Sequence, residues 1–498
     1  MPVSYLKIPN PEYSQESAVI DALVEPGALS VFDLVKIGVG PSSSHTMGPW
    51  TAMLDFVKRL EASGKLNQVV SVRVELFGSL AKTGRGHGTH VAVQMGLLGE
   101  SITDTDIEQM PARLDQIRDS QRILLGGIHD IPFDPKMAII NDIDRPCPVH
   151  ANTMQASAIF ADGSRHWETY YSIGGGFIQR EGEGPKASAS VKLPHPVSRG
   201  AELARWCDTE QVPIWEISRR NERVWRSDAV IDATLDKLFE TMIEAIYLGC
   251  HTDGILPGGL DVRRRAKGIH DRLMAGRSYS NRKEWLKQMR QTPNDLATST
   301  SWITCFALAV NEVNASYGRI VTAPTNGACG VIPAVLFHYW CFTPGASQDD
   351  VRNFILVAGE IGCLFKKGAT ISAAAGGCQA EIGVSSSMAA AALTAVKGGS
   401  AGQSLMAAEI AMEHHLGLTC DPVGGLVQIP CIERNSMGAM KAITACQIAL
   451  FGAPEDAKVS LDAVVGTMLE TARNMDHRYK ETAEGGLALR VPVNLPDC

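Results

Sequence analysis

Residues 181–190 read Glu-Gly-Glu-Gly-Pro-Lys-Ala-Ser-Ala-Ser, a charged stretch rich in glycine, serine and proline. This composition is typical of an interdomain linker, because glycine and serine add flexibility and proline interrupts regular structure. The chain has 498 residues, which exceeds the roughly 100–200 residues of one ordinary domain. We therefore expect a first domain at residues 30–182, a linker at 183–200 and a second domain at 201–498. Residues 1–29 are expected to form a polar N-terminal extension.

The first domain carries strand patterns together with helical ones. Apolar residues alternate with polar ones at Val70, Val72, Val74 and Leu76. This period of two indicates a half-buried strand. Asp162-Gly163 lies between two β-rich runs, residues 154–160 and 167–173, and predicts a hairpin. The expected fold class of this domain is α+β.

The second domain has a different character. Segments rich in alanine, leucine, methionine and glutamate occur at Ala229–Leu248, Leu296–Val313, Val351–Lys366, Met388–Lys397 and Leu405–Leu416. Loops rich in glycine and proline separate them, and no strand pattern stands out. The pattern predicts an all-α domain with functional loops at the helix ends.

The charge balance excludes several classes of partner. The chain has 46 basic and 54 acidic residues and a net charge of −8, which is no electrostatic footprint for nucleic acid or anionic lipid. The long uncharged stretch at residues 320–348 is interrupted by three prolines, whereas a spanning helix needs roughly 20 unbroken apolar residues. The N-terminus has neither a signal-peptide nor a transit-peptide pattern. We expect a soluble, cytoplasmic protein with no nucleic-acid or membrane partner.

Two loops rich in hydroxyl and amide side chains lead into predicted helices. Residues 38–46 read Gly-Val-Gly-Pro-Ser-Ser-Ser-His-Thr, and residues 322–330 read Thr-Ala-Pro-Thr-Asn-Gly-Ala-Cys-Gly. Free backbone N–H groups at a helix start favour a bound carboxylate or phosphate. The alternative interpretations are an ordinary serine-rich helix cap and a tight connection between helices that buries Cys329. The candidate binding residues are Ser43, Ser44, Thr46, Thr325, Asn326 and Gly327.

Two histidines are candidates for proton transfer. His45 lies in the first of these loops, and Pro49 after it suits a first helical turn. His87 lies in the glycine-rich turn at residues 83–90, which follows the predicted strand. Loop histidines near a strand end are well placed for catalysis, although a structural or merely exposed histidine gives the same pattern.

The cysteines are concentrated from residue 250 onward, where ten of the twelve lie. In a reducing compartment such a surplus indicates buried thiols, a metal site or both. Cys378, Cys420 and Cys431 lie beside glycine or proline in predicted loops or helix edges, where thiolates can approach a metal cluster closely. Their separations match no local cluster motif. The chain ends on Cys498.

Four segments together carry a resemblance to a known family. They are residues 30–46, 171–177 (Tyr-Ser-Ile-Gly-Gly-Gly-Phe), 322–330 and 413–435, the last containing Leu-Thr-Cys-Asp-Pro and Ile-Pro-Cys-Ile-Glu-Arg-Asn. They closely resemble the iron–sulfur-dependent L-serine dehydratases (L-serine ammonia-lyases) of bacteria, in the single-chain form. The resemblance runs from about residue 30 to the C-terminus. It implies an N-terminal domain similar to a regulatory domain of D-3-phosphoglycerate dehydrogenase, followed by a helical catalytic domain.

The same resemblance implies a cofactor and a reaction. A [4Fe–4S] cluster would be held by Cys378, Cys420 and Cys431, with Cys498 on the fourth iron when substrate is absent. The iron would act as a Lewis acid on the serine hydroxyl while His45 or His87 serves proton transfer, which gives aminoacrylate and then pyruvate and ammonia. The two hydroxyl-rich loops would hold the substrate carboxylate. The resemblance also implies a homodimer.

Two positions depart from the family pattern. Residue 90 is His where relatives often carry Asp, and residue 375 is Ala where Glu is common, so the surroundings of the cluster differ.

Two other functions compete with this one. The same reaction by pyridoxal phosphate would need a Schiff-base lysine in a Ser-x-Lys setting beside a glycine-rich phosphate loop, and no such pattern occurs. A non-catalytic iron–sulfur or serine-binding regulator is the alternative from a different class.

Overall fold

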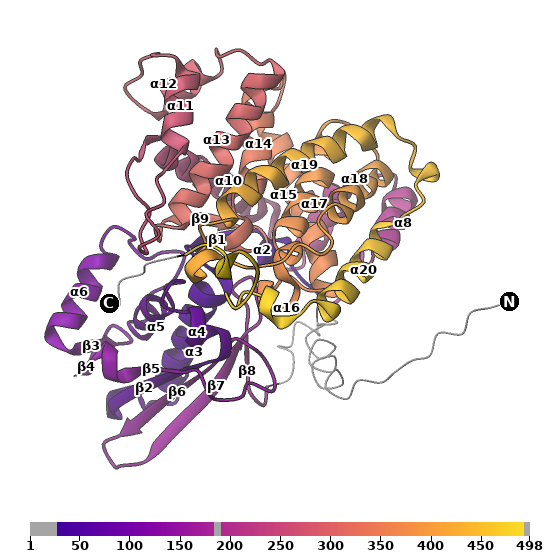
Figure 1. Ribbon diagram of the computed structural model, residues 1–498. Helices are drawn as coiled ribbons and strands as arrows, with labels where there is room; N and C mark the ends of the chain where they lie inside the picture. Colours follow the sequence, from indigo (N-terminus) through magenta and orange to yellow (C-terminus); the bar gives the residue numbers. More distant parts are fainter. Residues whose placement is uncertain (1–26, 184–190, 493–498) are drawn as a thin grey trace.

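The structure is a computed structural model that describes residues 27–183 and 191–492. Most of the predicted extension, part of the predicted linker and the predicted ligand Cys498 lie outside the described residues. Figure 1 shows a sheet-containing part formed by the first third of the chain and a larger helical part beside it. The chain segment that ends at residue 492 runs between these two parts.

The first part is built on a five-stranded sheet with the strand order β5-β2-β6-β7-β8. Its strands are β2 (Val69–Phe77), β5 (Ile139–Asp142), β6 (Thr153–Phe160), β7 (Arg165–Ser172) and β8 (Ile178–Arg180). Strand β5 pairs with β2 in parallel, and the remaining neighbours are antiparallel. The predicted strand and the predicted hairpin at Asp162-Gly163 are both confirmed. The β2–β6 register shifts between Val69 and Ser71, and Val70 is 45% exposed although the alternation had placed it inside.

This part also contains helices and a hairpin that forms a separate two-stranded sheet. They are α3 (Gly48–Ala62), α4 (Gly78–Thr83), α5 (Thr89–Leu97), α6 (Met110–Ser120) and the short α7 (Pro135–Ala138), and the hairpin joins β3 (Arg122–Leu125) to β4 (His129–Pro132). Helix α3 begins with a proline in its first turn, as Pro49 predicts. Its apolar face at Met53, Phe56 and Leu60 is fully buried in the core of this part. This packing holds the loop before α3 in place.

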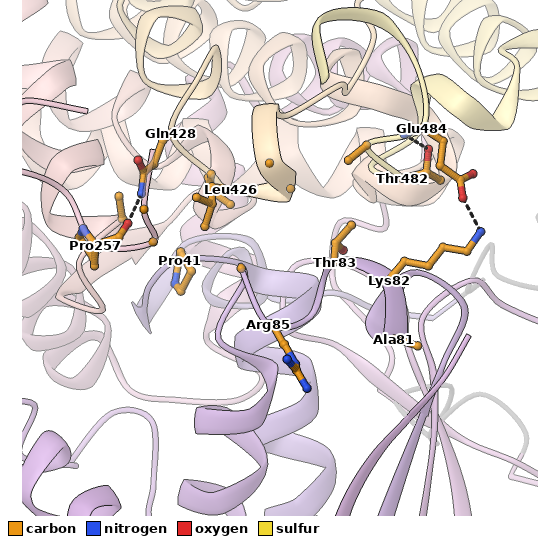
Figure 2. Close-up of a pocket in the computed structure, with 18 of the residues that line it drawn as sticks. Pro41, Ala81, Lys82, Thr83, Arg85, Pro257, Leu426, Gln428, Thr482 and Glu484 are labelled. Atoms are coloured by element: carbon orange, nitrogen blue, oxygen red, sulfur yellow. Dashed lines mark hydrogen bonds and ion pairs between the residues drawn. The ribbon is translucent and has the colours of Figure 1, made fainter. Parts of the chain in front are cut away.

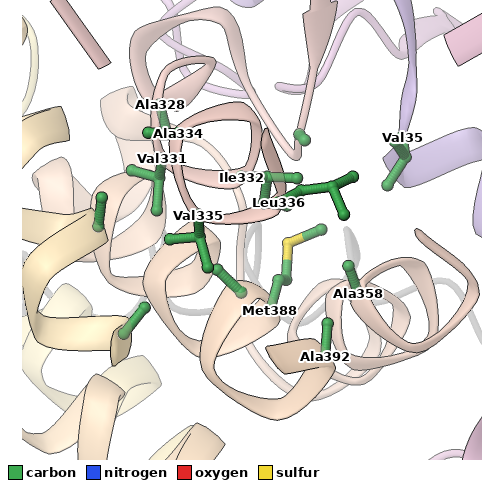
Figure 3. Close-up of a cluster of buried hydrophobic side chains, with 14 of the residues drawn as sticks. Val35, Ala328, Val331, Ile332, Ala334, Val335, Leu336, Ala358, Met388 and Ala392 are labelled. Atoms are coloured by element: carbon green, nitrogen blue, oxygen red, sulfur yellow. The ribbon is translucent and has the colours of Figure 1, made fainter. Parts of the chain in front are cut away.

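The second part is a helical assembly. Its main helices are α8 (Gly200–Glu210), α9 (Ile214–Glu222), α10 (Asp228–His251), α11 (Ala266–Met274), α12 (Arg282–Met289), α13 (Leu296–Asn314), α14 (Val331–Phe342), α15 (Gln348–Gly368), α17 (Ile382–Val396), α18 (Ala401–Glu413), α19 (Cys431–Phe451) and α20 (Leu461–Asn474). The five predicted helical segments are confirmed. Helix α17 contacts α14, α15, α18 and α19, and small residues such as Ala392 and the adaptable Met388 let these helices pack closely (Figure 3).

The second part is mostly helical, as the sequence predicts, and it contains a short strand. Strand β9 (Arg319–Thr322) lies in it and pairs antiparallel with β1 (Lys36–Val39) from the N-terminal part. A strand of four residues whose only described partner lies far away in sequence leaves no local periodicity to detect. The short helix α2 (Val31–Leu34) also packs on α15. The first residues of the N-terminal part, Leu29 to Val35, therefore contribute apolar side chains to the core of the helical part. Among the described residues, no helix combines the length and apolarity needed to span a bilayer.

Candidate functional site

Three thiols gather at the junction of the two parts. Cys378 lies in the short turn before α17, Cys420 in the loop before α19, and Cys431 at the first residue of α19. All three side chains are buried. The sulfurs of Cys378 and Cys420 and a carboxylate oxygen of Glu381 lie within 4.8 Å of one another. The predicted ligands Cys378 and Cys420 are therefore brought together, and Cys431 is close enough for its pKa to respond to Cys378.

Arg434 stabilises negative charge on these sulfurs. Its guanidinium donates to Cys378 Sγ at 3.2 Å and to the Thr419 carbonyl at 2.6 Å, while a second nitrogen donates to Asp421 Oδ1 at 3.0 Å. A hydrogen bond from Cys420 and the charge of Arg434 lower the pKa of Cys378. The pKa of Cys420 is raised, mainly because Cys420 donates this hydrogen bond to Cys378 and so keeps its proton, and also because Cys420 is buried. These surroundings therefore favour negative charge on the Cys378 sulfur.

This donor set fits an iron–sulfur cluster. Buried thiols are the soft ligands that such clusters take, and an arginine that donates to a sulfur is a typical outer partner of a cluster thiolate. Glu381 adds a buried carboxyl whose pKa is raised to about 7 by burial. Sequence reasoning missed both Glu381 and Arg434 as site residues, although Arg434 lies in the quoted Ile-Pro-Cys-Ile-Glu-Arg-Asn motif.

The two predicted histidines are stacked on one another beside the thiols. The ring centroids of His45 and His87 are 4.5 Å apart with an interplanar angle of 29°. His87 Nδ1 donates to the Thr83 carbonyl at 3.0 Å, so the neutral ring keeps its lone pair on Nε2. Burial lowers the pKa of His87 to about 4. His87 is therefore neutral near pH 7, with Nε2 available to accept a proton.

His45 is held on both sides of its ring by hydroxyl groups. Its Nε2 lies 3.0 Å from both Ser79 Oγ and Thr83 Oγ1, and its Nδ1 lies 2.9 Å from Ser44 Oγ. Burial, followed by the nearby ring of His87, lowers the pKa of His45 well below its usual value. The ring is thus fixed in orientation and neutral. A chain of hydroxyls surrounds it that can relay a proton.

Glu481 connects the histidines to the thiols, and sequence reasoning missed it. Its carboxylate accepts from Ser44 Oγ at 3.3 and 3.4 Å and lies 3.6 Å from His45 Nδ1 and 4.0 Å from His87 Nε2. Its backbone N–H donates to the Cys420 carbonyl at 2.9 Å. Burial raises the pKa of Glu481 well above its usual range. The surrounding residues Lys480 and Thr482 are polar, so no local pattern distinguishes this glutamate from a surface residue.

The predicted substrate-binding residues divide into two groups. In the first group the side chains of Thr46 and Asn326 bind the protein itself. Thr46 Oγ1 donates to the His87 carbonyl at 2.6 Å, and Asn326 Nδ2 donates to the Val39 carbonyl at 2.8 Å and to Asn314 Oδ1 at 3.2 Å. Ser43 is buried in the turn that precedes α3. These bonds position the loops, and direct substrate binding by these three residues stays a prediction.

The second group faces the thiol centre. Ser44 donates a hydrogen bond to Glu481, as described above. The Thr325 hydroxyl lies near the Glu381 carboxyl and lowers its pKa, against the larger raising effect of burial. At Gly327 a Cβ atom would lie 2.8 and 2.9 Å from the two carboxylate oxygens of Glu381. The glycine therefore leaves the space that this carboxyl occupies. Substrate binding by Ser44, Thr325 and Gly327 stays a prediction, with a geometry that permits it.

A cavity of about 1110 Å³ opens beside the histidines (Figure 2). Its walls come from the turn after α4, from the glycine-rich loop before α19 and from the C-terminal segment. Thr83 lines it and also contacts His45, so Thr83 lies between the cavity and the stacked rings. Gln428, which donates to the Pro257 carbonyl at 2.5 Å, closes the far wall. The cavity is large enough to admit a small polar molecule to the site.

Fold and site together define a two-part protein with a thiol centre suited to a metal cluster and a neutral histidine pair beside it. Comparison with known proteins gives the family. Residues 30–183 match the serine dehydratase beta chain family, and residues 209–488 match the serine dehydratase alpha chain family. The chain therefore belongs to the serine dehydratase family, with both portions in one polypeptide.

Individual relatives cover almost the whole chain. An L-serine dehydratase of Streptomyces coelicolor is 47% identical over 475 residues, which is 95% of this chain and 100% of that protein. The L-serine dehydratase TdcG of Escherichia coli is 44% identical over 93% of this chain and 99% of its own length. An L-serine dehydratase of Mycobacterium tuberculosis is 44% identical over 94% of this chain and 100% of its own. The resemblance stated from the sequence is confirmed at the level of the family.

Proposed function

We propose that this protein is an iron–sulfur-dependent L-serine dehydratase, a lyase that deaminates L-serine to pyruvate and ammonia. Its relatives named L-serine dehydratase support serine deamination. The observation that carries the iron–sulfur assignment is the meeting of buried thiols with the His45–His87 pair at one junction. Segments from both parts of the chain contribute to this junction.

The cluster would be held by Cys378, Cys420 and Cys431. Cys498, which lies outside the described residues, would occupy the fourth position when substrate is absent. When bound, a [4Fe–4S] cluster supplies Lewis-acid chemistry toward a substrate hydroxyl group. Arg434 holds the Cys378 sulfur by a hydrogen bond and favours its ligating, thiolate form.

The chain's own residues supply proton transfer and orientation. His87 Nε2 carries a lone pair in a neutral ring, so it is the preferred acceptor for the proton on the substrate Cα. His45 is the second candidate, because its hydroxyl partners Ser79 and Thr83 can relay a proton toward the cavity. Glu481 lies between the two rings and the Cys420 loop and fixes their relative positions. Burial of these groups keeps bulk water away from the reacting atoms.

The test is pyruvate release from L-serine by protein purified without air, with iron and sulfide measured on the same sample. We expect activity to follow iron content and to disappear in air. Cys420→Ala should lose both iron and activity, whereas the matched control Cys207→Ala, a buried thiol of α8, should keep both. An active variant without iron would refute the mechanism. Full iron occupancy with no pyruvate would favour the alternative, a non-catalytic iron–sulfur or serine-binding regulator.

The proposal extends to organisation and location. We assign the N-terminal serine dehydratase domain to residues 30–182, the linker to 183–200 and the catalytic domain to 201–498, with a homodimeric assembly in the cytoplasm. Analytical ultracentrifugation of the anaerobic protein tests the assembly, and a single species of twice the 53.5 kDa chain mass is the expected result.

A further inference from the structure

A second cavity, of about 270 Å³, lies where three helices of the second part meet. Its walls come from the first residues of α8 and α20, from α18, and from the connection between α19 and α20 at residues 454–460. Helices α8, α18 and α20 contact one another and lie together in Figure 1. The volume is close to the lower end of the roughly 300–1,000 Å³ that small-molecule sites occupy. No residue of the thiol centre or of the histidine pair lines this cavity, so it is separate from the proposed reaction site.

A buried carboxyl group without a partner lines the cavity. Glu409 of α18 is 6% exposed, and its Oε2 atom has no hydrogen-bond partner in residues 27–183 and 191–492. Burial, and then the charge of Glu413, raise the pKa of Glu409 to about 7, whereas His414 acts in the opposite direction. A buried carboxyl group that lacks a donor costs free energy. The position therefore favours a ligand that brings N–H donors and positive charge.

The helix starts around the cavity already have their own acceptors. Asp462 Oδ1 accepts from the Gly200 N–H at 2.7 Å, and its Oδ2 accepts from the Ala201 N–H at 3.1 Å, so this carboxylate satisfies the first turn of α8. The side chains of Ser400 and Ser460 cap α18 and α20. Among the described residues that line the cavity, none is lysine, arginine or histidine. The wall thus carries acidic groups with no cation to balance them, which favours a cationic ligand over an anionic one.

Most of the remaining wall is apolar. Leu405 and Met406 of α18, Leu461 of α20, and Pro454 and Val459 of the connection between α19 and α20 all line the cavity. An inorganic cation would leave this surface without a partner, whereas a hydrocarbon chain would cover it. Removal of apolar surface from water adds affinity roughly in proportion to the area buried.

We propose that this cavity binds a small aliphatic primary amine in its ammonium form. The ammonium group would donate hydrogen bonds to the Glu409 carboxylate, and the hydrocarbon chain would lie against Leu405, Met406 and Leu461. The ligand would supply the donor that Glu409 lacks within the described part of the chain. This binding site does not rest on the proposed function, because neither the thiols nor the histidines contribute to it.

Isothermal titration calorimetry of the full chain, purified without air, tests the site with n-butylammonium chloride at constant ionic strength. We expect one n-butylammonium ion to bind per chain. Ethylammonium should bind about 15-fold more weakly, because each methylene group contributes about fourfold in affinity. The uncharged analogue 1-butanol should bind at least about tenfold more weakly than n-butylammonium, since a charged donor strengthens the hydrogen bond to a carboxylate.

Two variants show whether Glu409 holds the ammonium group. Glu409→Gln should weaken n-butylammonium binding at least about tenfold. This variant should fold with an unchanged or higher Tm, because it removes a buried carboxyl group whose Oε2 has no partner in the described residues. The matched control Glu470→Gln removes an exposed carboxylate of α20 and should keep the affinity of the original chain.

Three results would overturn the proposal. They are the absence of any heat of binding with n-butylammonium, an unchanged Kd in folded Glu409→Gln, and equal affinities for n-butylammonium and 1-butanol. Difference density from crystals soaked in n-butylammonium chloride gives a check that needs no variant. Density beside Glu409 is expected, and density only at another place would also refute the site. No pyruvate is measured in these experiments, so a failure of the proposed function would leave their outcome unaffected.

Discussion

Gly327→Ala is the substitution whose effect follows most directly from the geometry of the site. The new methyl carbon would lie 2.8 and 2.9 Å from the two carboxylate oxygens of Glu381 and 3.0 Å from its Cδ. Contacts under 3.0 Å are not tolerated, so the carboxyl group has to move. A carboxylate oxygen of Glu381 lies within 4.8 Å of the Cys378 and Cys420 sulfurs, so a movement of this group changes the surroundings of both thiols.

The substitution is expected to lower both the stability of the fold and the rate of the reaction. Introducing one extra carbon into a well-packed site costs about 1–3 kcal/mol of unfolding free energy. Displacing the Glu381 carboxyl toward the thiols disturbs the position of the ligands, and misplacement by about 1 Å costs up to roughly a hundredfold in rate. We therefore expect a lower Tm, a reduced iron content and a loss of kcat/KM between about tenfold and a hundredfold.

The assay combines anaerobic pyruvate release, iron and sulfide quantification and thermal unfolding on the same preparations. Gly268→Ala is the matched control, because a Cβ at this position in α11 meets nothing within 4 Å. It should leave activity unchanged and stabilise the protein by about 0.5–1 kcal/mol, since alanine is a better helix former than glycine. If Gly327→Ala retains normal Tm, iron and activity, the placement of Glu381 against this loop is wrong.

Three further substitutions test separate features of the chain. Glu481→Ala should keep iron but lower kcat by at least about tenfold and shift the pH profile of kcat. The reason is that the Glu481 side chain contacts Ser44 and lies beside His45. An unchanged pH profile would contradict this positioning role. Cys498→Ala should leave the cluster assembled but more labile to oxygen, and equal resistance to air would count against ligation. For His150, burial and then the charge of Lys366 lower the pKa from 6.5 to about 4, so the unfolded state binds more protons between these values and stability falls as pH drops through that window. His150→Gln should flatten this fall by at most about 3 kcal/mol in urea unfolding, and an identical pH dependence would refute the assignment.

Local sequence patterns predicted many of the helices and strands and several residues of the candidate site. The hairpin around Asp162-Gly163 and the helix that begins near Pro49 follow from turn chemistry and periodicity, and both are present. Cys378 and Cys420 were identified because they lie near glycine or proline in predicted loops or helix edges and because the surrounding motifs resemble those of the family. The histidines were found by the same combination of glycine-rich loop and polar neighbours.

Contacts between distant segments were decided only by the tertiary structure. Strand β9 escaped detection because its four residues acquire their pairing from β1, which lies far away in the sequence. Glu481 lies in an ordinary polar stretch, and only the return of the C-terminal segment to the Cys420 loop buries it against Ser44 and His45. The physical reason is that hydrogen-bond periodicity and turn preferences act over a few residues. Burial, pKa shifts and the alignment of catalytic groups depend on packing between segments that carry no local record of one another.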